Sequence, residues 1–103
     1  MIRIRVTRKA GEIISLVCQG HAGYAEEGHD IVCAAVSVLA FTCANALESV
    51  AGVQPKVEEK DGFLSVFLPE NAGHDAQTVM NTVLQGFRDL SDAYPTYLQL
   101  KEN

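Results

Sequence analysis

Two stretches of this chain repeat their apolar residues at intervals of three and four, and this spacing constrains the fold more than any other feature. The apolar positions are Val32, Val36, Leu39, Ala40, Cys43, Leu47 and Val50 in the first stretch, and Ala76, Val79, Met80, Val83, Leu84, Phe87, Leu90 and Tyr94 in the second. Such spacing gathers apolar side chains on one face of an α-helix. We therefore predict two amphipathic helices, the first closed by Gly52 and the second stopped before Pro95.

Strand-like patterns flank the first predicted helix on both sides. Residues 2–7 alternate apolar with basic or polar side chains, and residues 13–19 read as the returning strand. Residues 53–59 and 63–68 lie on either side of Lys60-Asp61-Gly62. An Asp-Gly pair between two strand-like runs predicts a β-hairpin, because glycine accepts a positive φ.

A last strand over residues 96–100 completes the order strand, strand, helix, strand, strand, helix, strand. The chain has 103 residues, of which 48% are hydrophobic, and this size suits one core. We predict a single domain, residues 1–103, of the α+β class. Its two layers are a largely antiparallel sheet and two helices packed on one face of that sheet.

Composition limits where such a chain works. The alternating N-terminal residues lack the apolar run of a signal peptide, and residues 31–47 are shorter than the ~20 residues that span a bilayer and contain polar side chains. We expect no membrane segment. The three cysteines are an odd number without the dense spacing of a disulfide scaffold, which favours a reducing cytoplasm.

The charge balance argues against a nucleic-acid partner. The formal net charge is −5, and the cluster of basic residues is confined to Arg3, Arg5, Arg8 and Lys9. Nucleic-acid binding relies on clustered Lys and Arg, so we expect no direct nucleic-acid contact. A cationic peptide is the better-matched partner.

The segment between the second strand and the first helix carries a histidine and a cysteine suited to joint chemistry. Residues 20–30 have loop composition, His21 follows the strand, and Cys33 lies in the first turn of the predicted helix. We predict that Asp30 is the N-cap, which puts Cys33 at the third helical position, where the positive end of the helix favours a thiolate. A nearby imidazole can then protonate a leaving amine, and free backbone N–H groups can stabilise an oxyanion.

The same segment resembles a known family. Gly20-His21-Ala22 followed by Gly28-His29-Asp30-Ile31-Val32-Cys33-Ala34 is similar to the signature of the ribosomal-processing cysteine proteases. The resemblance implies a catalytic role for His21, a nucleophilic role for Cys33 and a motif position for Asp30. Length and predicted elements agree with that family over the whole chain.

The resemblance also implies a substrate and a setting. The family removes a short N-terminal extension from a large-subunit ribosomal protein, cutting after a hydrophobic, Phe-rich stretch. It implies no cofactor and a homodimer in a bacterial cytoplasm. We further predict that Gly20, Ala22 and Ser37 contact the substrate, although Ser37 could equally bond to its own helix backbone.

Other functions fit parts of the same pattern. Cys18, His21, His29 and Cys33 are potential zinc ligands, but they lack the paired spacing of structural zinc sites. A non-catalytic ribosome-assembly adaptor would bind a ribosomal protein and tolerate loss of the thiol. A thiol-dependent acyl transferase would need an enclosed pocket. Cys18 and Cys43 are predicted to be core residues.

Overall fold

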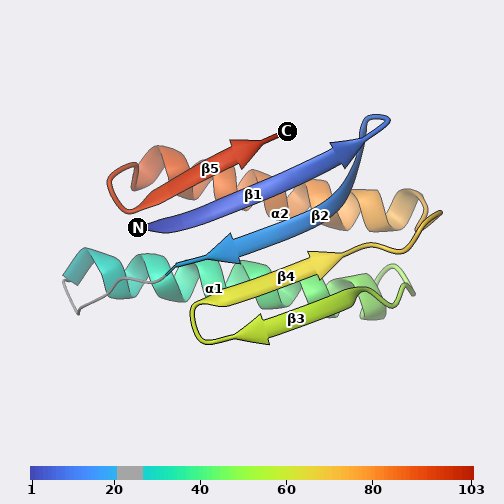
Figure 1. Ribbon diagram of the computed structural model, residues 1–103, viewed down its shortest axis with the longest axis horizontal. Helices are drawn as coiled ribbons and strands as arrows, with labels where there is room; N and C mark the ends of the chain where they lie inside the picture. Colours follow the sequence, from blue (N-terminus) through green and yellow to red (C-terminus); the bar gives the residue numbers. More distant parts are fainter. Residues whose placement is uncertain (21–26) are drawn as a thin grey trace.

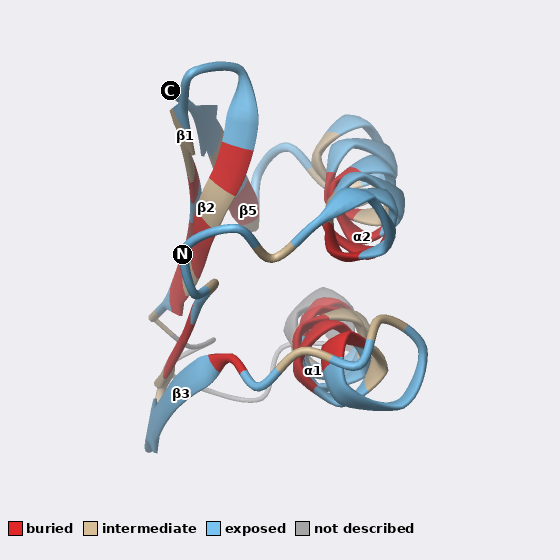
Figure 2. Ribbon diagram, turned by 90° about the vertical axis from the view of Figure 1, so that its right-hand side faces the viewer, coloured by how far each residue is buried: buried red, intermediate tan, exposed pale blue. Residues whose placement is uncertain are grey.

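The protein folds into two layers, an open five-stranded sheet and two helices that both pack on one of its faces (Figures 1 and 2). The computed structural model describes residues 1–20 and 27–103, and the side chains of 27–30 are not part of that description. The elements are β1 (Ile2–Lys9), β2 (Glu12–Gln19), α1 (Glu27–Ser49), β3 (Lys56–Lys60), β4 (Phe63–Phe67), α2 (His74–Ala93) and β5 (Leu98–Glu102). The predicted α+β architecture is confirmed.

The strands lie in the order β3-β4-β2-β1-β5. Three neighbouring pairs are antiparallel, whereas β5 runs parallel to β1, with Ile2 opposite Leu98. A parallel neighbour needs a long crossover, and the segment containing α2 supplies it between β4 and the edge position of β5. The prediction of a largely antiparallel sheet therefore holds, and β5 begins two residues later than expected.

The hairpin and the end of α1 follow the predicted turn chemistry. Lys60 pairs with Phe63 across a turn in which Gly62 has a φ of +72°. After α1, the N–H of Gly52 donates to the carbonyl of Glu48 at 3.1 Å. Both glycines lie in the left-handed region that side chains disfavour, as the sequence predicted.

The core fills the space between the sheet and the helices. Inward-facing Ile4 and Val66 are almost completely buried, as are Leu47 of α1 and Phe87 of α2. Each helix therefore presents its predicted stripe to the strands, except that Val50, predicted to belong to the first stripe, is exposed and follows the end of α1. The sheet face opposite the helices stays open (Figure 2).

Helix α1 is more apolar than its buried stripe requires. Residues Ile31–Ser49 form a 19-residue segment of mean hydropathy 1.8, long and apolar enough by length and composition to cross a membrane. Length alone therefore does not exclude a membrane-spanning helix here, contrary to the argument made from residues 31–47. In this fold the buried side of the segment forms the core, while Ile31, Val38 and Phe41 are exposed on the other side.

Gln77 joins α2 to the sheet at an irregular point. Pairing between β1 and β2 shifts register between Thr7 and Arg8. There the N–H of Ile13 donates to Oε1 of Gln77, and Nε2 of Gln77 donates to the carbonyl of Ile13, both at 2.8 Å. One amide side chain thus satisfies both backbone groups of a buried strand residue.

Replacing Gln77 with leucine should lower the free energy of unfolding by about 1–3 kcal/mol, because two partly buried backbone groups of Ile13 lose their partners. Urea denaturation measures the change. Gln85→Leu is the matched control, since Gln85 donates only to exposed Asp89 on the same helix. Its unfolding free energy should change by less than ~0.5 kcal/mol, and equal losses in the two variants would contradict a role for the clamp on Ile13.

Candidate active site

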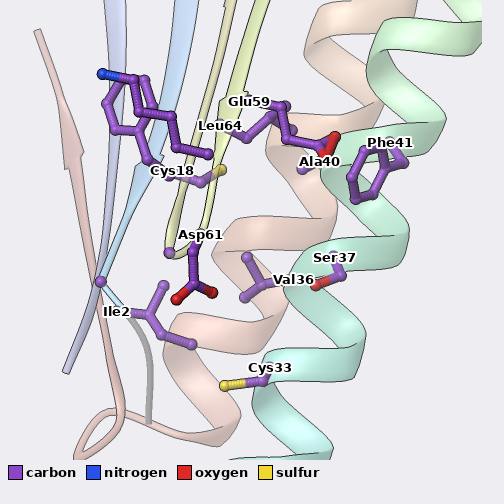
Figure 3. Close-up of a pocket in the computed structure, with 14 residues that line it drawn as sticks. Ile2, Cys18, Cys33, Val36, Ser37, Ala40, Phe41, Glu59, Asp61 and Leu64 are labelled. Carbon is purple, nitrogen blue, oxygen red and sulfur yellow. The ribbon is translucent and has the colours of Figure 1, made fainter. Parts of the chain in front are cut away.

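A cavity of about 360 Å³ lies between α1 and the β3–β4 hairpin (Figure 3). Its walls come from β1, β2 and the residue after it, α1 and the hairpin. The lining residues are Ile2, Cys18, Gly20, Cys33, Val36, Ser37, Ala40, Phe41, Glu59, Lys60, Asp61, Gly62, Phe63 and Leu64. It therefore collects residues that are distant in sequence.

The α1 wall of the cavity is a row of residues four apart. Cys33, Ser37 and Phe41 follow one another along the helix and all line the cavity. Each comes directly after a residue of the buried stripe, so the row emerges at the edge of the core. The sulfur of half-buried Cys33 points into the cavity, and Ser37 is exposed there, which favours a site role for Ser37 over a buried one (Figure 3).

Helix α1 begins earlier than predicted. It starts at Glu27, so Asp30 is its fourth residue and Cys33 its seventh. The prediction that Asp30 is the N-cap is therefore wrong. The free N–H groups and the dipole of a helix act over its first turn, and Cys33 lies in the second. The expected placement of Cys33 at the positive helix end is corrected by the same observation.

The side chains of three predicted site residues are not described by the structure. His21 and Ala22 lie outside the described residues, and the side chain of Asp30 does too. Their roles stay predictions. The remaining three, Gly20, Cys33 and Ser37, meet in one cavity.

Gly20 sets the path of the chain into this region. It has a φ of +99°, and a Cβ added there would lie 2.5 Å from the carbonyl oxygen of Met1. Its N–H donates to the carbonyl of Gly62 at 2.9 Å. The end of β2 is thus held between the chain start and the hairpin turn. Only glycine fits there without a backbone shift.

The three cysteines occupy different environments. Burial raises the pKa of Cys43 to about 12, and burial together with the charge of Cys43 raises the pKa of Cys18 to about 12. Cys43 also contacts the sulfur of Met80 at 3.4 Å. Both buried thiols stay protonated at neutral pH, and the prediction that they are core residues is confirmed. Cys33 is the half-buried thiol of the three.

The hairpin supplies cavity residues that sequence reasoning missed. Glu59 and Asp61 both line the cavity, and the carboxylate of Asp61 points into it (Figure 3). Val36 and Leu64 provide apolar surface between them and the core. The Asp61-Gly62 turn was visible in the sequence, but its position beside α1 depends on the strand order.

No group of three His, Cys, Asp or Glu side chains that could hold a metal ion occurs among the described residues. Two of the four potential zinc ligands lie beyond them: His21, and the side chain of His29. Of the four, Cys18 and Cys33 both line the cavity.

Comparison with known proteins gives a consistent result. Residues 1–99 match the family model described as cysteine protease Prp. The chain is 32% identical over 89 residues to the ribosomal processing cysteine protease Prp of Bacillus subtilis strain 168, covering 84% of this chain and 80% of that protein.

Two solved structures share the fold over the full length of both chains. One is the essential ribosomal processing protease Prp from S. aureus in complex with a substrate peptide, with a TM-score of 0.92 and 25% identity. The other is the same S. aureus protease with a covalently linked product peptide, with a TM-score of 0.90 and 26% identity.

Brief treatment of the folded protein with iodoacetamide at neutral pH should modify Cys33 alone, because Cys18 and Cys43 are buried and protonated. Mass spectrometry of peptides after digestion identifies the modified thiol. The Cys33→Ala variant should take up no label until urea unfolds it. Rapid labelling of Cys18 or Cys43 in the folded protein would contradict the described burial.

Proposed function

This chain belongs to the cysteine protease Prp family, and we propose that it removes a short N-terminal extension from a large-subunit ribosomal protein, with Cys33 as nucleophile and His21 as general base and acid. The observation that carries the proposal is the cavity beside α1, into which the half-buried thiol of Cys33 points. Gly20, the residue before His21, lines the same cavity.

The chemistry follows from these two groups. The sulfur of Cys33 attacks the carbonyl carbon of the scissile peptide bond, after its proton has passed to the imidazole of His21. The C–N bond then breaks, and the imidazolium gives that proton to the leaving amine. Water activated by the same imidazole hydrolyses the thioester, which frees the acid product and restores the thiol. Asp30 is proposed to orient His21.

The shape of the cavity favours a peptide substrate. Its α1 wall runs from Cys33 to Phe41, eight residues apart, which at 1.5 Å per residue is about 12 Å. That length matches about three or four residues of extended chain. An elongated cleft suits a peptide better than the enclosed small-molecule pocket that an acyl transferase would need.

The lining of the cavity suits the proposed cleavage sequence. Val36, Ala40 and Phe41 offer apolar contacts to hydrophobic substrate residues, whereas Glu59 and Asp61 offer negative charge to a cationic ribosomal segment. Gly20, Ala22 and Ser37 are proposed to contact the substrate near the scissile bond. No step in this reaction requires a cofactor.

The decisive experiment is mass spectrometry of an extended large-subunit ribosomal protein incubated with each variant. Wild type should trim the extension, Cys33→Ala should leave it intact, and His21→Ala should slow trimming by about 10²–10⁴-fold. Thr42→Ala is the control, since Thr42 is exposed on α1 and does not line the cavity, and it should trim like wild type.

Two results would contradict this proposal. Trimming by Cys33→Ala would exclude Cys33 as the nucleophile. Tight binding of the extended protein by wild type without any trimming would favour the ribosome-assembly adaptor instead.

We also propose that the protein works in the bacterial cytoplasm as a homodimer that uses the outer face of α1. Ile31 and Val38 are 56% and 65% exposed there. These side chains lie on one side of the helix, at the spacing expected for an apolar contact surface. A second copy of the chain would cover this surface and bury it from water.

Val38→Asp should convert a dimer into a monomer, because dimerisation would bury the new carboxylate in an apolar contact. Light scattering coupled to size-exclusion chromatography measures the molar mass. Val50→Asp is the matched control: Val50 is 68% exposed but follows the end of α1. A monomeric wild type, or a Val38→Asp variant that stays dimeric, would contradict the proposed interface.

A further inference from the structure

The open face of the sheet carries a concentration of positive charge. Strand side chains alternate between faces, and Ile2, Ile4 and Val6 of β1 point into the core. Arg3 and Arg5 therefore point away from the helices, onto the face that Figure 2 shows uncovered. A chain of net charge −5 thus has a basic face.

Strand register brings further polar groups beside these two arginines. Arg3 lies opposite Gln19 of β2 and Gln99 of β5, and Arg5 lies opposite Lys101 of β5. All five residues line one hollow of about 410 Å³ on this face. We call these five residues the basic hollow.

Among the described residues, no carboxylate forms an ion pair with the cations of the basic hollow. Within the described part of the chain, the ion pairs join Arg8 and Arg88 to Glu102. Arg5 and Lys101 lie directly opposite each other, and like charges at such positions destabilise a sheet. Protection of a sheet edge does not explain the arginines, because β1 is an interior strand. A bound anionic ligand would attract both cations and so offset the repulsion between Arg5 and Lys101.

Against the expectation of no nucleic-acid contact that the net charge gave, we propose that the basic hollow binds the phosphodiester backbone of single-stranded RNA. Guanidinium groups bind phosphate oxygens through two parallel hydrogen bonds, and amide side chains bond to sugar and phosphate oxygens. Phe63 lies opposite Gln19 and Lys60 lies opposite Phe63, so the row through Arg3 continues with an aromatic ring and another cation. Aromatic side chains on an open sheet stack with unpaired bases, which favours RNA over an acidic protein.

The basic hollow and the catalytic cavity lie on opposite faces of the same strand end. Ile2 lines the cavity, whereas the next residue, Arg3, lines the hollow. None of the five residues of the basic hollow lines the cavity, whereas Phe63 and Lys60, which continue the row through Arg3, do line it. Substitution of the hollow residues therefore leaves the lining of the proposed peptide site unchanged.

The test compares two triple variants that remove the same charge from different places. The hollow variant removes the three charges of the basic hollow and is Arg3→Gln/Arg5→Gln/Lys101→Gln. The control variant removes three positive charges from other positions and is Arg8→Gln/Lys9→Gln/Arg88→Gln. Fluorescence anisotropy with a short fluorescein-labelled single-stranded RNA gives Kd over a series of salt concentrations. Circular dichroism and cleavage of the extended substrate confirm that each variant is folded.

Wild type should bind the RNA with a marked salt dependence. The hollow variant should raise Kd more than about tenfold, and its slope of log K against log salt should be shallower by about 2, as expected for three lost phosphate contacts. The control variant should bind within about threefold of wild type. Cleavage of the substrate peptide should persist in both.

A single substitution, Arg5→Gln, provides a second measurement. It should reduce the salt slope by about 0.7 while leaving urea stability unchanged or higher, since it removes the repulsion with Lys101. The proposal is overturned if wild type does not bind RNA, if both triple variants lose binding equally, or if a fluorescein-labelled polyglutamate peptide binds the hollow more tightly than RNA.

Discussion

The packing of α1 against the sheet is the constraint on which the site depends. Val32 and Val36 are buried on the inner side of this helix, and successive helical residues turn by about 100°. Cys33 and Ser37 each follow one of these valines, so burial of the stripe holds them at the edge of the core. The thiol of Cys33 is thereby held at a fixed place on the wall of the cavity by the packing of the helix.

The second support of the site comes from the hairpin, which faces α1 across the cavity. Its turn is tied to the end of β2 by the hydrogen bond from Gly20 to Gly62. Because β2 is an interior strand, this bond fixes the hairpin and Gly20, the residue before His21, to the same sheet. Both walls of the cavity therefore rest on regular secondary structure.

Periodicity was enough to predict both helices, the hairpin, the two-layer architecture and the core role of Cys43. Periodicity did not predict the start of α1. Gly28 disfavours helix and Asp30 is a favourable N-cap, so the sequence indicated a start after Asp30, whereas the helix begins at Glu27. The order of the strands was also inaccessible. Long-range pairing decides the strand order, and this order places Asp61 in the same cavity as Cys33 and β5 parallel to β1.

Net charge did not predict the basic face of the sheet, because strand pairing decides where the charged side chains lie. A sum over the chain predicts an acidic molecule, but the alternation of side chains along β1 sends its apolar residues inward and its arginines outward. Pairing with β5 then adds Lys101 to the same face. Adjacent residues of one strand point to opposite faces, so Ile2 lines the cavity beside α1 while Arg3 lines the cationic surface. Strand register, rather than composition, determines which residues form that cationic surface.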